Sequence, residues 1–170
     1  LADGGHEIPS LRESHDPGLQ AAMENRIKRL GLEPAVANGK LSLALVDITE
    51  LDSPRVADLN GDRMMYAASL PKIGILLGAF VEIERGRMRM DDDLFESLSR
   101  MIRHSSNEDA TLNLNRVGKR KVNRILRSDR FRLYDPLVNG GIWVGKEYAK
   151  GPAFERDPLH NLSHGATALQ

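Results

Sequence analysis

Apolar residues recur at helical spacing early in the chain. Leu19, Met23, Ile27 and Leu30 follow one another at spacings of four, four and three residues, so they share one face of a helix. The preceding pair Asp16-Pro17 has the N-cap and first-turn chemistry that starts a helix, and Gly31 is typical of the position just past a helix end. We therefore predict an amphipathic helix between these two signals.

Strand-like patterns follow this helix. Residues 41–48 begin with a strict alternation of apolar and polar positions, which is typical of a half-buried strand. Residues 56–66 contain Asn60-Gly61, a strong signal for the tight turn of a β-hairpin. We predict a strand over the first segment and a hairpin over the second.

The most apolar segment of the chain is residues 73–83, which follow Pro71 and end before Gly86. A proline is tolerated in the first turn of a helix, because its missing N–H would have had no partner there. Apolar residues would occupy nearly every side of this helix. The pattern therefore predicts a helix that is buried all round.

Three further helices are predicted downstream. The first follows Asp91-Asp92-Asp93. Three aspartates are a candidate metal site, but we interpret them as a capped helix start, with negative charge at the positive end of the helix dipole. The second runs from about residue 108 and ends at Gly118. A basic amphipathic helix comes next, and we expect its Lys and Arg side chains to form only its solvated face.

The last part of the chain is irregular. Residues 128–162 are interrupted by several Gly and Pro residues, and a loop this long in a compact domain is usually functional or disordered. Trp143 and Tyr148 within it favour packing. Ser163 then has the character of an N-cap, which predicts a final helix over residues 165–170.

Composition is that of an ordinary globular protein. The 170 residues are 41% apolar and 28% charged, with a formal net charge of zero and no cysteine. This length suits one domain, and we predict a flexible N-terminus over residues 1–16 and one domain over residues 17–170.

The charge balance gives no reason to expect a nucleic-acid partner, and no apolar run is long enough for a membrane span. The lack of cysteine excludes thiol catalysis and cysteine-based metal sites.

Ser69 and Lys72 lie at the predicted start of the apolar helix. Residues three apart share a helical face, and a serine needs a nearby base to become a nucleophile. The alternative is an N-cap serine followed by a solvated lysine. The apolar helix favours the first interpretation, because it predicts that Lys72 is partly buried, and a buried lysine is costly unless it is paired or neutralised.

A second polar pair, Ser105 and Asn107, falls in a tight loop between two predicted helices. An Asn side chain can donate to a carbonyl and accept from an amide N–H, so it suits an amide-bearing ligand. A second serine near a Ser–Lys pair can pass a proton to a leaving nitrogen. Taken alone, this loop is better explained as a helix cap.

Together, Ser69-Leu70-Pro71-Lys72 and Ser105-Ser106-Asn107 resemble the S-x-x-K and S-D-N elements of class A β-lactamases and penicillin-binding proteins. Residues 107–118 are similar to the helix after S-D-N in those enzymes, residues 41–48 to their first strand, and residues 163–167 to a later helix start. The resemblance implies an α/β (α+β) architecture of the β-lactamase/transpeptidase-like fold. It would include the helical domain and the first strands of the antiparallel sheet.

The resemblance also implies roles for four residues. Ser69 would be the nucleophile that accepts the acyl group, and its own N–H would form half of the oxyanion hole. Lys72 would be the base or proton relay, which requires it to be substantially neutral. Ser105 would pass the proton to the leaving group, and Asn107 would bind the amide side chain of the substrate.

Two elements of that family are missing from the sequence. No Lys-Thr-Gly or Lys-Ser-Gly follows the second motif. We therefore expect the C-terminal strands to lie beyond Gln170, on a C-terminal fragment chain that completes the fold. The class A deacylation motif E-x-x-L-N is also absent. Its nearest counterpart is Asp135 with Asn139, and Glu147 and Glu155 are alternatives. Without a deacylating base, the acyl-enzyme would persist.

The expected function is that of a serine hydrolase that forms an acyl-enzyme with a β-lactam, a peptide or an ester. A D,D-peptidase or esterase is one alternative, and a non-catalytic protein that binds or senses a β-lactam or peptidoglycan ligand is another. No cofactor or metal is expected. His160 and His164 have the spacing of a helical metal pair, but the residues between them have the character of a cap and no third ligand is evident. By resemblance, the protein would be periplasmic or secreted.

Overall fold

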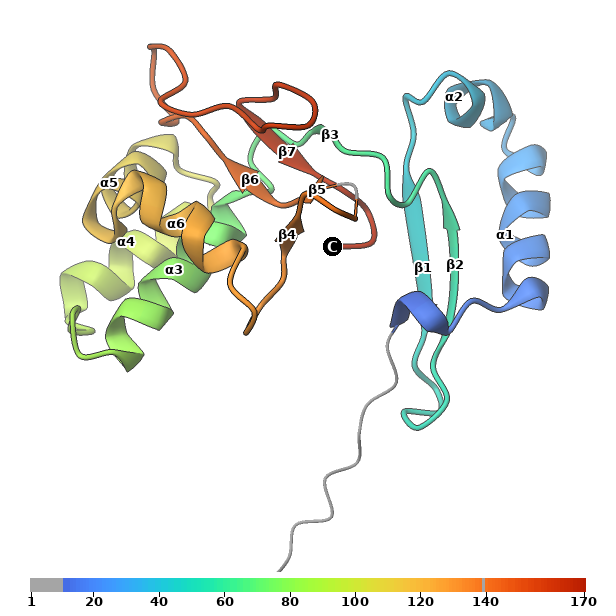
Figure 1. Cartoon of the computed structure of the whole chain (residues 1–170), viewed down its shortest axis with the longest axis horizontal. Helices are drawn as coiled ribbons and strands as arrows, with labels where there is room; N and C mark the ends of the chain where they lie inside the picture. Colours follow the sequence, from blue (N-terminus) through green and yellow to red (C-terminus); the bar gives the residue numbers. More distant parts are fainter. Residues whose placement is uncertain (1–10, 139) are drawn as a thin grey trace, which may run out of the picture. The chain divides into compact units, whose positions relative to one another are not determined.

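A computed structural model describes residues 11–138 and 140–170, and these residues form two compact units (Figure 1). The first unit extends to Arg63 and includes Leu169, and the second runs from Met64 to Ala168 and includes Gln170. The region predicted as one domain thus contains two units. Helices and small antiparallel sheets together give an α+β architecture.

From residue 11 onward, where the structure describes it, the first unit combines three short or medium helices with one antiparallel strand pair. Its elements are η1 (Leu11–Glu13), α1 (Pro17–Arg29), α2 (Glu33–Ala37), β1 (Leu43–Asp47) and β2 (Arg55–Leu59). The predicted N-cap is confirmed, because the side chain of Asp16 accepts a hydrogen bond of 2.6 Å from the backbone N–H of Leu19. Met23 and Ile27 of the predicted apolar face are buried, but Leu30, which was predicted on the same face, is the C-cap residue and is 56% exposed.

The predicted hairpin over residues 56–66 is wrong. β2 pairs with β1, from Leu43 opposite Leu59 to Asp47 opposite Arg55. Asn60 has a left-handed φ of 54°, but its side chain donates to the carbonyls of Val36 and Leu41, at 2.8 and 3.0 Å. Those bonds tie the Asn-Gly turn to earlier segments, so the turn ends β2 and does not reverse the chain onto a neighbouring strand.

The segment just before α1 is bonded to β2. The carbonyl of Ser14 accepts from the N–H of Val56 at 2.8 Å, and the N–H of Asp16 donates to the carbonyl of Val56 at 2.9 Å. Residues 11–16, predicted to be flexible, therefore hold defined backbone contacts. The rest of that predicted segment, residues 1–10, lies outside the described residues.

Four helices dominate the second unit. They are α3 (Lys72–Glu84), α4 (Asp92–Arg103), α5 (Asn107–Val117) and α6 (Lys119–Leu126), and Figure 1 shows them gathered beside the short strands of the unit. All four were predicted. Among the described residues, no helix combines the length and apolar character needed to cross a bilayer.

Helix α3 is not buried all round, contrary to the prediction. Ile73 and Phe80 are 54% and 51% exposed. The buried stripe contains Gly74, Ile75 and Gly78, among others, because close packing against α5 and α6 requires small residues on that face. A Cβ on Gly78 would lie 2.9 Å from a methyl of Val117.

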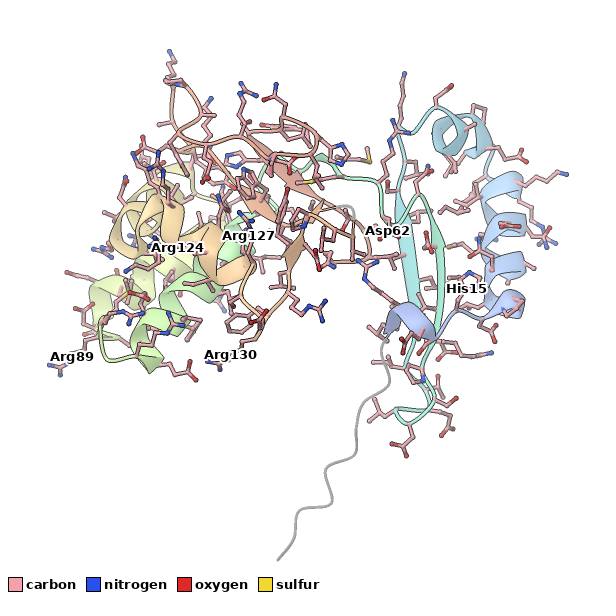
Figure 2. All side chains as sticks on the ribbon, viewed as in Figure 1. His15, Asp62, Arg89, Arg124, Arg127 and Arg130 are labelled. Atoms are coloured by element: carbon pink, nitrogen blue, oxygen red, sulfur yellow. The ribbon has the colours of Figure 1, made fainter. Side chains whose placement is uncertain are left out.

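The capping prediction for α4 and the predicted apolar stripe of α6 are confirmed. The carboxylate of Asp91 accepts from the N–H of Leu94 at 2.9 Å, so the acidic run starts a helix. Helix α6 buries an apolar stripe that includes Val122 and Leu126. Its Arg124 is exposed and extends from the outer surface of the helix in Figure 2. The basic side chains of α6 do not form only a solvated face, however, because Lys121 donates to the buried carboxylate of Glu82 at 2.7 Å and Lys119 pairs with Glu147 at 2.6 Å.

In the described part of the second unit, residues 64–138 and 140–168 include five short strands that form two small sheets. They are β3 (Met65–Tyr66), β4 (Tyr134–Asp135), β5 (Gly140–Gly141), β6 (Trp143–Val144) and β7 (His164–Ala166). The order in the larger sheet is β3-β7-β6, and β4 pairs with β5. All pairings are antiparallel.

The predicted C-terminal helix is wrong, because residues 164–166 form β7. This strand has partners on both sides: Trp143 and Met65 lie opposite Gly165 and Ala166, respectively. All three residues of β7 are buried. Tertiary strand pairing therefore overrides the local cap signal at Ser163. A Cβ on Gly165 would lie 2.4 Å from the Cε of Met64, so glycine permits this close approach.

The irregular segment is packed, as its aromatic residues predicted. Trp143 and Tyr134 are each 1% exposed, and their rings lie 4.8 Å apart. Asn123 of α6 binds both backbone groups of Val144, at 2.8 and 3.1 Å. Tyr134 also donates its hydroxyl to the buried carboxylate of Asp157. These contacts fix residues 140–157 against the helices and so position the loop that faces Ser69.

Candidate active site

Ser69 lies in the turn immediately before α3 and is exposed. Pro71 occupies the N-cap position and no side chain caps the helix, so the helix-cap interpretation of Ser69 is wrong. Among the described residues, none makes a hydrogen bond to the Ser69 hydroxyl. The preceding Ala68 has a left-handed φ of 44°, an unfavourable conformation for alanine that is typical of constrained functional turns.

Lys72 is almost completely buried, as the sequence predicted, with an exposure of 2%. Its ammonium donates to the carbonyl of Ser105 at 2.5 Å, to the hydroxyl of Ser105 at 3.0 Å and to the amide oxygen of Asn107 at 2.9 Å. The two polar motifs, 33 and 35 residues apart along the chain, therefore meet at this lysine. All three N–H bonds of the ammonium have acceptors.

Neighbouring polar residues at the junction of α4 and α5 have different hydrogen-bond partners. Ser106 caps α5 through a bond of 3.1 Å from the N–H of Asp109, which leaves Ser105 and Asn107 to bind Lys72. Asp109 in turn accepts from Arg100 of α4 at 2.8 and 3.1 Å. Ser105 has a left-handed φ of 53°, so the loop holds a second strained residue beside the site.

The environment of Lys72 contains opposing influences on its charge. Burial lowers the pKa of Lys72 from its ordinary value. Three acceptors favour the ammonium, and the ring of Tyr148 lies 4.8 Å from its nitrogen in a cation–π contact. A neutral Lys72 could still donate to the two carbonyl-type oxygens and accept from the hydroxyl of Ser105. Lys72 and Ser105 can thus form a hydrogen bond whether Lys72 is charged or neutral.

Two aromatic residues beside Lys72 were missed as site residues. The rings of Tyr148 and His164 stack with centroids 4.5 Å apart. His164 is 3% exposed, and burial lowers its pKa to about 4, with smaller contributions from the charges of Lys146 and Lys72. Burial also raises the pKa of Tyr148. No local pattern marks either residue, because both reach the site through the loop and strand pairing.

A pocket of about 270 Å³ opens beside the nucleophile candidate. Tyr66, Ser69 and Asn107 line it from one part of the unit, and residues 146–149 and His164 line it from another. The nucleophile candidate is thus accessible next to a buried, hydrogen-bonded lysine. This arrangement suits acyl transfer, which needs an exposed nucleophile, a proton relay and room for a substrate.

Comparison with protein families agrees with this geometry. A family model described as the beta-lactamase enzyme family matches residues 22–108, which is half of the chain and includes both motifs. The chain belongs to the beta-lactamase enzyme family. No curated protein and no solved structure matches it significantly.

In this beta-lactamase family member, Asp135 is not among the residues that line the Ser69 pocket. It lines a separate pocket with Arg132 and Leu137, and its carboxylate accepts from the N–H of Leu137 at 2.8 Å. Its partner in the predicted motif, Asn139, lies outside the described residues.

Glu147 does line the Ser69 pocket. Its carboxylate forms an ion pair of 2.6 Å with Lys119 and accepts from the side chain of Asn115 at 3.2 Å. These contacts lower the pKa of Glu147, so the group is ionised and already engaged. Glu155 accepts a hydrogen bond of 3.4 Å from the side chain of Asn123.

The described part of this family member holds no group of three or more His, Asp or Glu side chains arranged to bind a metal. His160 lies on an exposed turn, whereas His164 belongs to buried β7. The two residues therefore do not share a helix, and their spacing does not create a helical metal pair.

Proposed function

We propose that the chain is a serine hydrolase that forms an acyl-enzyme at Ser69 with a β-lactam, a peptide or an ester. The observation that carries this proposal is the burial of Lys72 with hydrogen bonds to Ser105 and Asn107, next to the pocket that exposes Ser69. Membership of the beta-lactamase enzyme family supports the same class of reaction.

In the proposed acylation step, the hydroxyl oxygen of Ser69 attacks the substrate carbonyl and its proton passes to Lys72. The backbone N–H of Ser69 stabilises the oxyanion. When the tetrahedral intermediate collapses, the hydroxyl of Ser105 protonates the leaving nitrogen or oxygen, and Lys72 returns its proton to Ser105. The bond of 3.0 Å between Lys72 and Ser105 supports this relay. The side chain of Asn107 orients an amide of the substrate.

Deacylation is the slower step in this proposal. Asp135 lies in a different pocket, which argues against its role as the deacylating acid. Glu147 lies nearer to the acyl group but is held by Lys119 and Asn115. We propose that hydrolysis of the acyl-enzyme is slow, and that any water activation depends on Glu147.

The engaged state of Glu147 also favours a second candidate function. A protein that acylates but does not turn over would bind or sense a β-lactam or a peptidoglycan ligand, with Ser69 acting once. A D,D-peptidase or esterase would use the same acylation step with a different leaving group. These functions differ in the fate of the acyl-enzyme, so its lifetime separates them.

Nitrocefin, a chromogenic β-lactam, provides the test. We expect a burst of colour of about one equivalent per protein molecule, followed by slow turnover that falls further in Glu147→Gln and is unchanged in Asp135→Asn. Fast linear turnover would identify an efficient lactamase and contradict slow deacylation. Neither burst nor turnover, with no covalent adduct, would contradict acylation by β-lactams and leave the peptidase or esterase function for testing with peptide and ester substrates.

Family membership also supports a periplasmic or secreted location, which we propose for the protein. Cell fractionation of the source organism tests it, because the proposal requires the protein in the periplasmic or culture fraction and fails if the protein is found only with cytoplasmic markers.

A further inference from the structure

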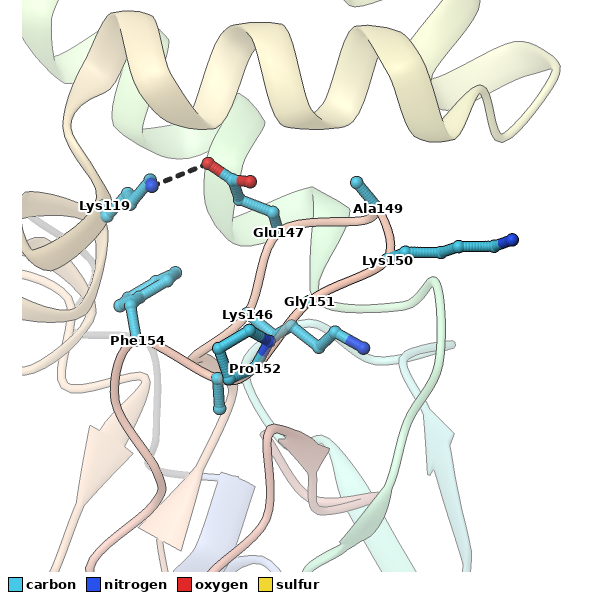
Figure 3. Close-up of a pocket in the computed structure, with 9 residues that line it drawn as sticks. Lys119, Lys146, Glu147, Ala149, Lys150, Gly151, Pro152 and Phe154 are labelled. Carbon is cyan, nitrogen blue, oxygen red and sulfur yellow. Dashed lines mark ion pairs between the residues drawn. The ribbon is translucent and has the colours of Figure 1, made fainter.

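The Ser69 pocket has a neighbour that is lined by part of the same segment, residues 146–149. This second pocket has a volume of about 280 Å³ and shares Lys146, Glu147 and Ala149 with the first. Figure 3 shows its lining side chains. Because the two pockets share these lining residues, they adjoin each other.

More positive than negative side chains line the second pocket. Lys119, Lys146 and Lys150 line it together with Glu147, and Glu147 is neutralised by its ion pair of 2.6 Å with Lys119. Within residues 11–138 and 140–170, neither Lys146 nor Lys150 forms an ion pair. In Figure 3 both of these side chains extend to the same side, away from the Lys119–Glu147 pair. Two positive charges in the lining of the pocket are therefore left uncompensated.

The other surfaces of the pocket are apolar and held in place. Phe154 forms part of the lining, with the ammonium of Lys119 5.9 Å from its ring centroid. The carbonyl of Gly145 accepts from the N–H groups of Phe154 and Glu155, at 2.9 and 3.1 Å, which closes residues 145–155 into a loop. A Cβ on Gly145 would lie 1.9 Å from the carbonyl oxygen of Glu155, so this closure requires glycine.

We propose that the second pocket is a subsite for a carboxylate carried on the acyl part of the substrate. The uncompensated ammonium groups of Lys146 and Lys150 would bind the carboxylate, and the apolar lining around Phe154 would contact the chain that carries it. The proposal deepens the proposed function and rests on it, since the subsite is useful to the reaction only if Ser69 is acylated. Lys146 also helps to keep the pKa of His164 low, which is consistent with its charge reaching both pockets.

Two p-nitrophenyl esters of equal chain length test the proposal. The glutaric acid monoester carries a free carboxylate, and the pentanoic acid ester does not. We expect Ser69 to be acylated at least tenfold faster by the glutaryl ester, and this ratio to fall at least fivefold in Lys150→Gln and in Lys146→Gln. Lys40→Gln, which changes an exposed lysine of the first unit, keeps the wild-type ratio. Raising the salt concentration should also reduce the ratio, because exposed charges are screened.

A binding measurement separates failure of the subsite from failure of the nucleophile. Glutarate is titrated into Ser69→Ala protein while backbone amide shifts are followed by NMR. Shifts at residues 145–154 that disappear in the Lys146→Gln/Lys150→Gln double variant support the subsite, even if Ser69 is not acylated by either ester. Acylation without a glutaryl preference, or glutarate shifts that the double variant retains, would overturn the subsite and leave the proposed function intact.

Discussion

Lys72 connects the two residues of the second motif that the proposed mechanism uses. Its three bonds reach only Ser105 and Asn107, and among these acceptors only the hydroxyl of Ser105 can also donate. A relay through Lys72 therefore requires that hydroxyl. Ser106, one residue away, serves a different purpose because it caps α5. The two neighbouring serines form a matched pair for testing chemistry against stability.

We predict that Ser105→Ala slows acylation by about 10²–10⁴-fold, which is the usual contribution of a positioned acid–base group. Its free energy of unfolding should change by less than about 1 kcal/mol, because the side chain is exposed. Ser106→Ala should do the reverse, losing about 1 kcal/mol as a lost helix cap does, with a much smaller effect on acylation. Adduct formation over time and urea unfolding measure both quantities. Equal slowing by the two substitutions would contradict the relay.

His164 makes stability depend on pH in a defined direction. Its pKa is about 4 in the folded protein and about 6.5 when unfolded, so between these values the unfolded chain binds the extra proton. The stabilising contribution is complete above pH 6.5 and is lost progressively as the pH falls toward 4, by up to about 1.4 kcal/mol per pH unit. Urea unfolding from pH 4 to 7 should show this slope. His164→Gln should show less of it, and an unchanged slope would mean that other groups cause it.

The sequence alone identified the candidate site residues whose roles depend on residues close to them in the chain. Ser69 and Lys72 were found from their spacing, and the burial of Lys72 from the apolar helix behind it. Tyr148 and His164 could not be found in this way, since their contact with Lys72 depends on the path of residues 128–162. No periodic pattern encodes that path.

Among the secondary-structure elements, α3 and its packing against α5 position the site residues. It carries Lys72 at its first position and packs against α5, which carries Asn107 at its own first position. The distance between these two helices therefore sets the distance between the two motifs. Gly78 lies at the close contact, where a Cβ would come within 2.9 Å of Val117.

We predict that Gly78→Ala destabilises the protein by about 1–3 kcal/mol, the usual cost of overpacking a core. Gly74→Ala on the same helix is the matched control. Its Cβ would lie 3.2 Å from a terminal methyl of Leu126, which can move, and alanine gains about 0.5–1 kcal/mol over glycine in a helix interior. Gly74→Ala should thus be close to neutral. Equal urea midpoints for the two variants would show that the helix contact is not tight.

The helices were predictable because their signals are local. Asp16, Asp91 and Gly118 mark helix boundaries through bonds or dihedral angles within a few residues. The hairpin at Asn60-Gly61 and the final helix were predicted wrongly, and both errors concern strand pairing. Strand partners in this chain are up to about 100 residues apart, as for Met65 and Ala166, and local turn or cap chemistry does not specify such partners.

On the scale of the whole molecule, the site is assembled within the second unit. Residues 66–69, 105–107, 146–149 and 164 come together there. The family match from residue 22 to residue 108 includes part of the first unit, Ser69 and the second motif, but ends before the loop that supplies Lys146 and Tyr148. The proposed attack machinery therefore falls within the matched region. The residues proposed to select the substrate fall outside it.

The most direct test of the central claim is the position of the covalent adduct. The protein is incubated with a β-lactam, and the adduct is located by peptide mapping with mass spectrometry in the wild type, Ser69→Ala and the control Ser53→Ala, an exposed serine of the first unit. We expect one adduct, on Ser69, that is present in the control and absent in Ser69→Ala. An adduct on another residue, or one that persists in Ser69→Ala, would contradict it.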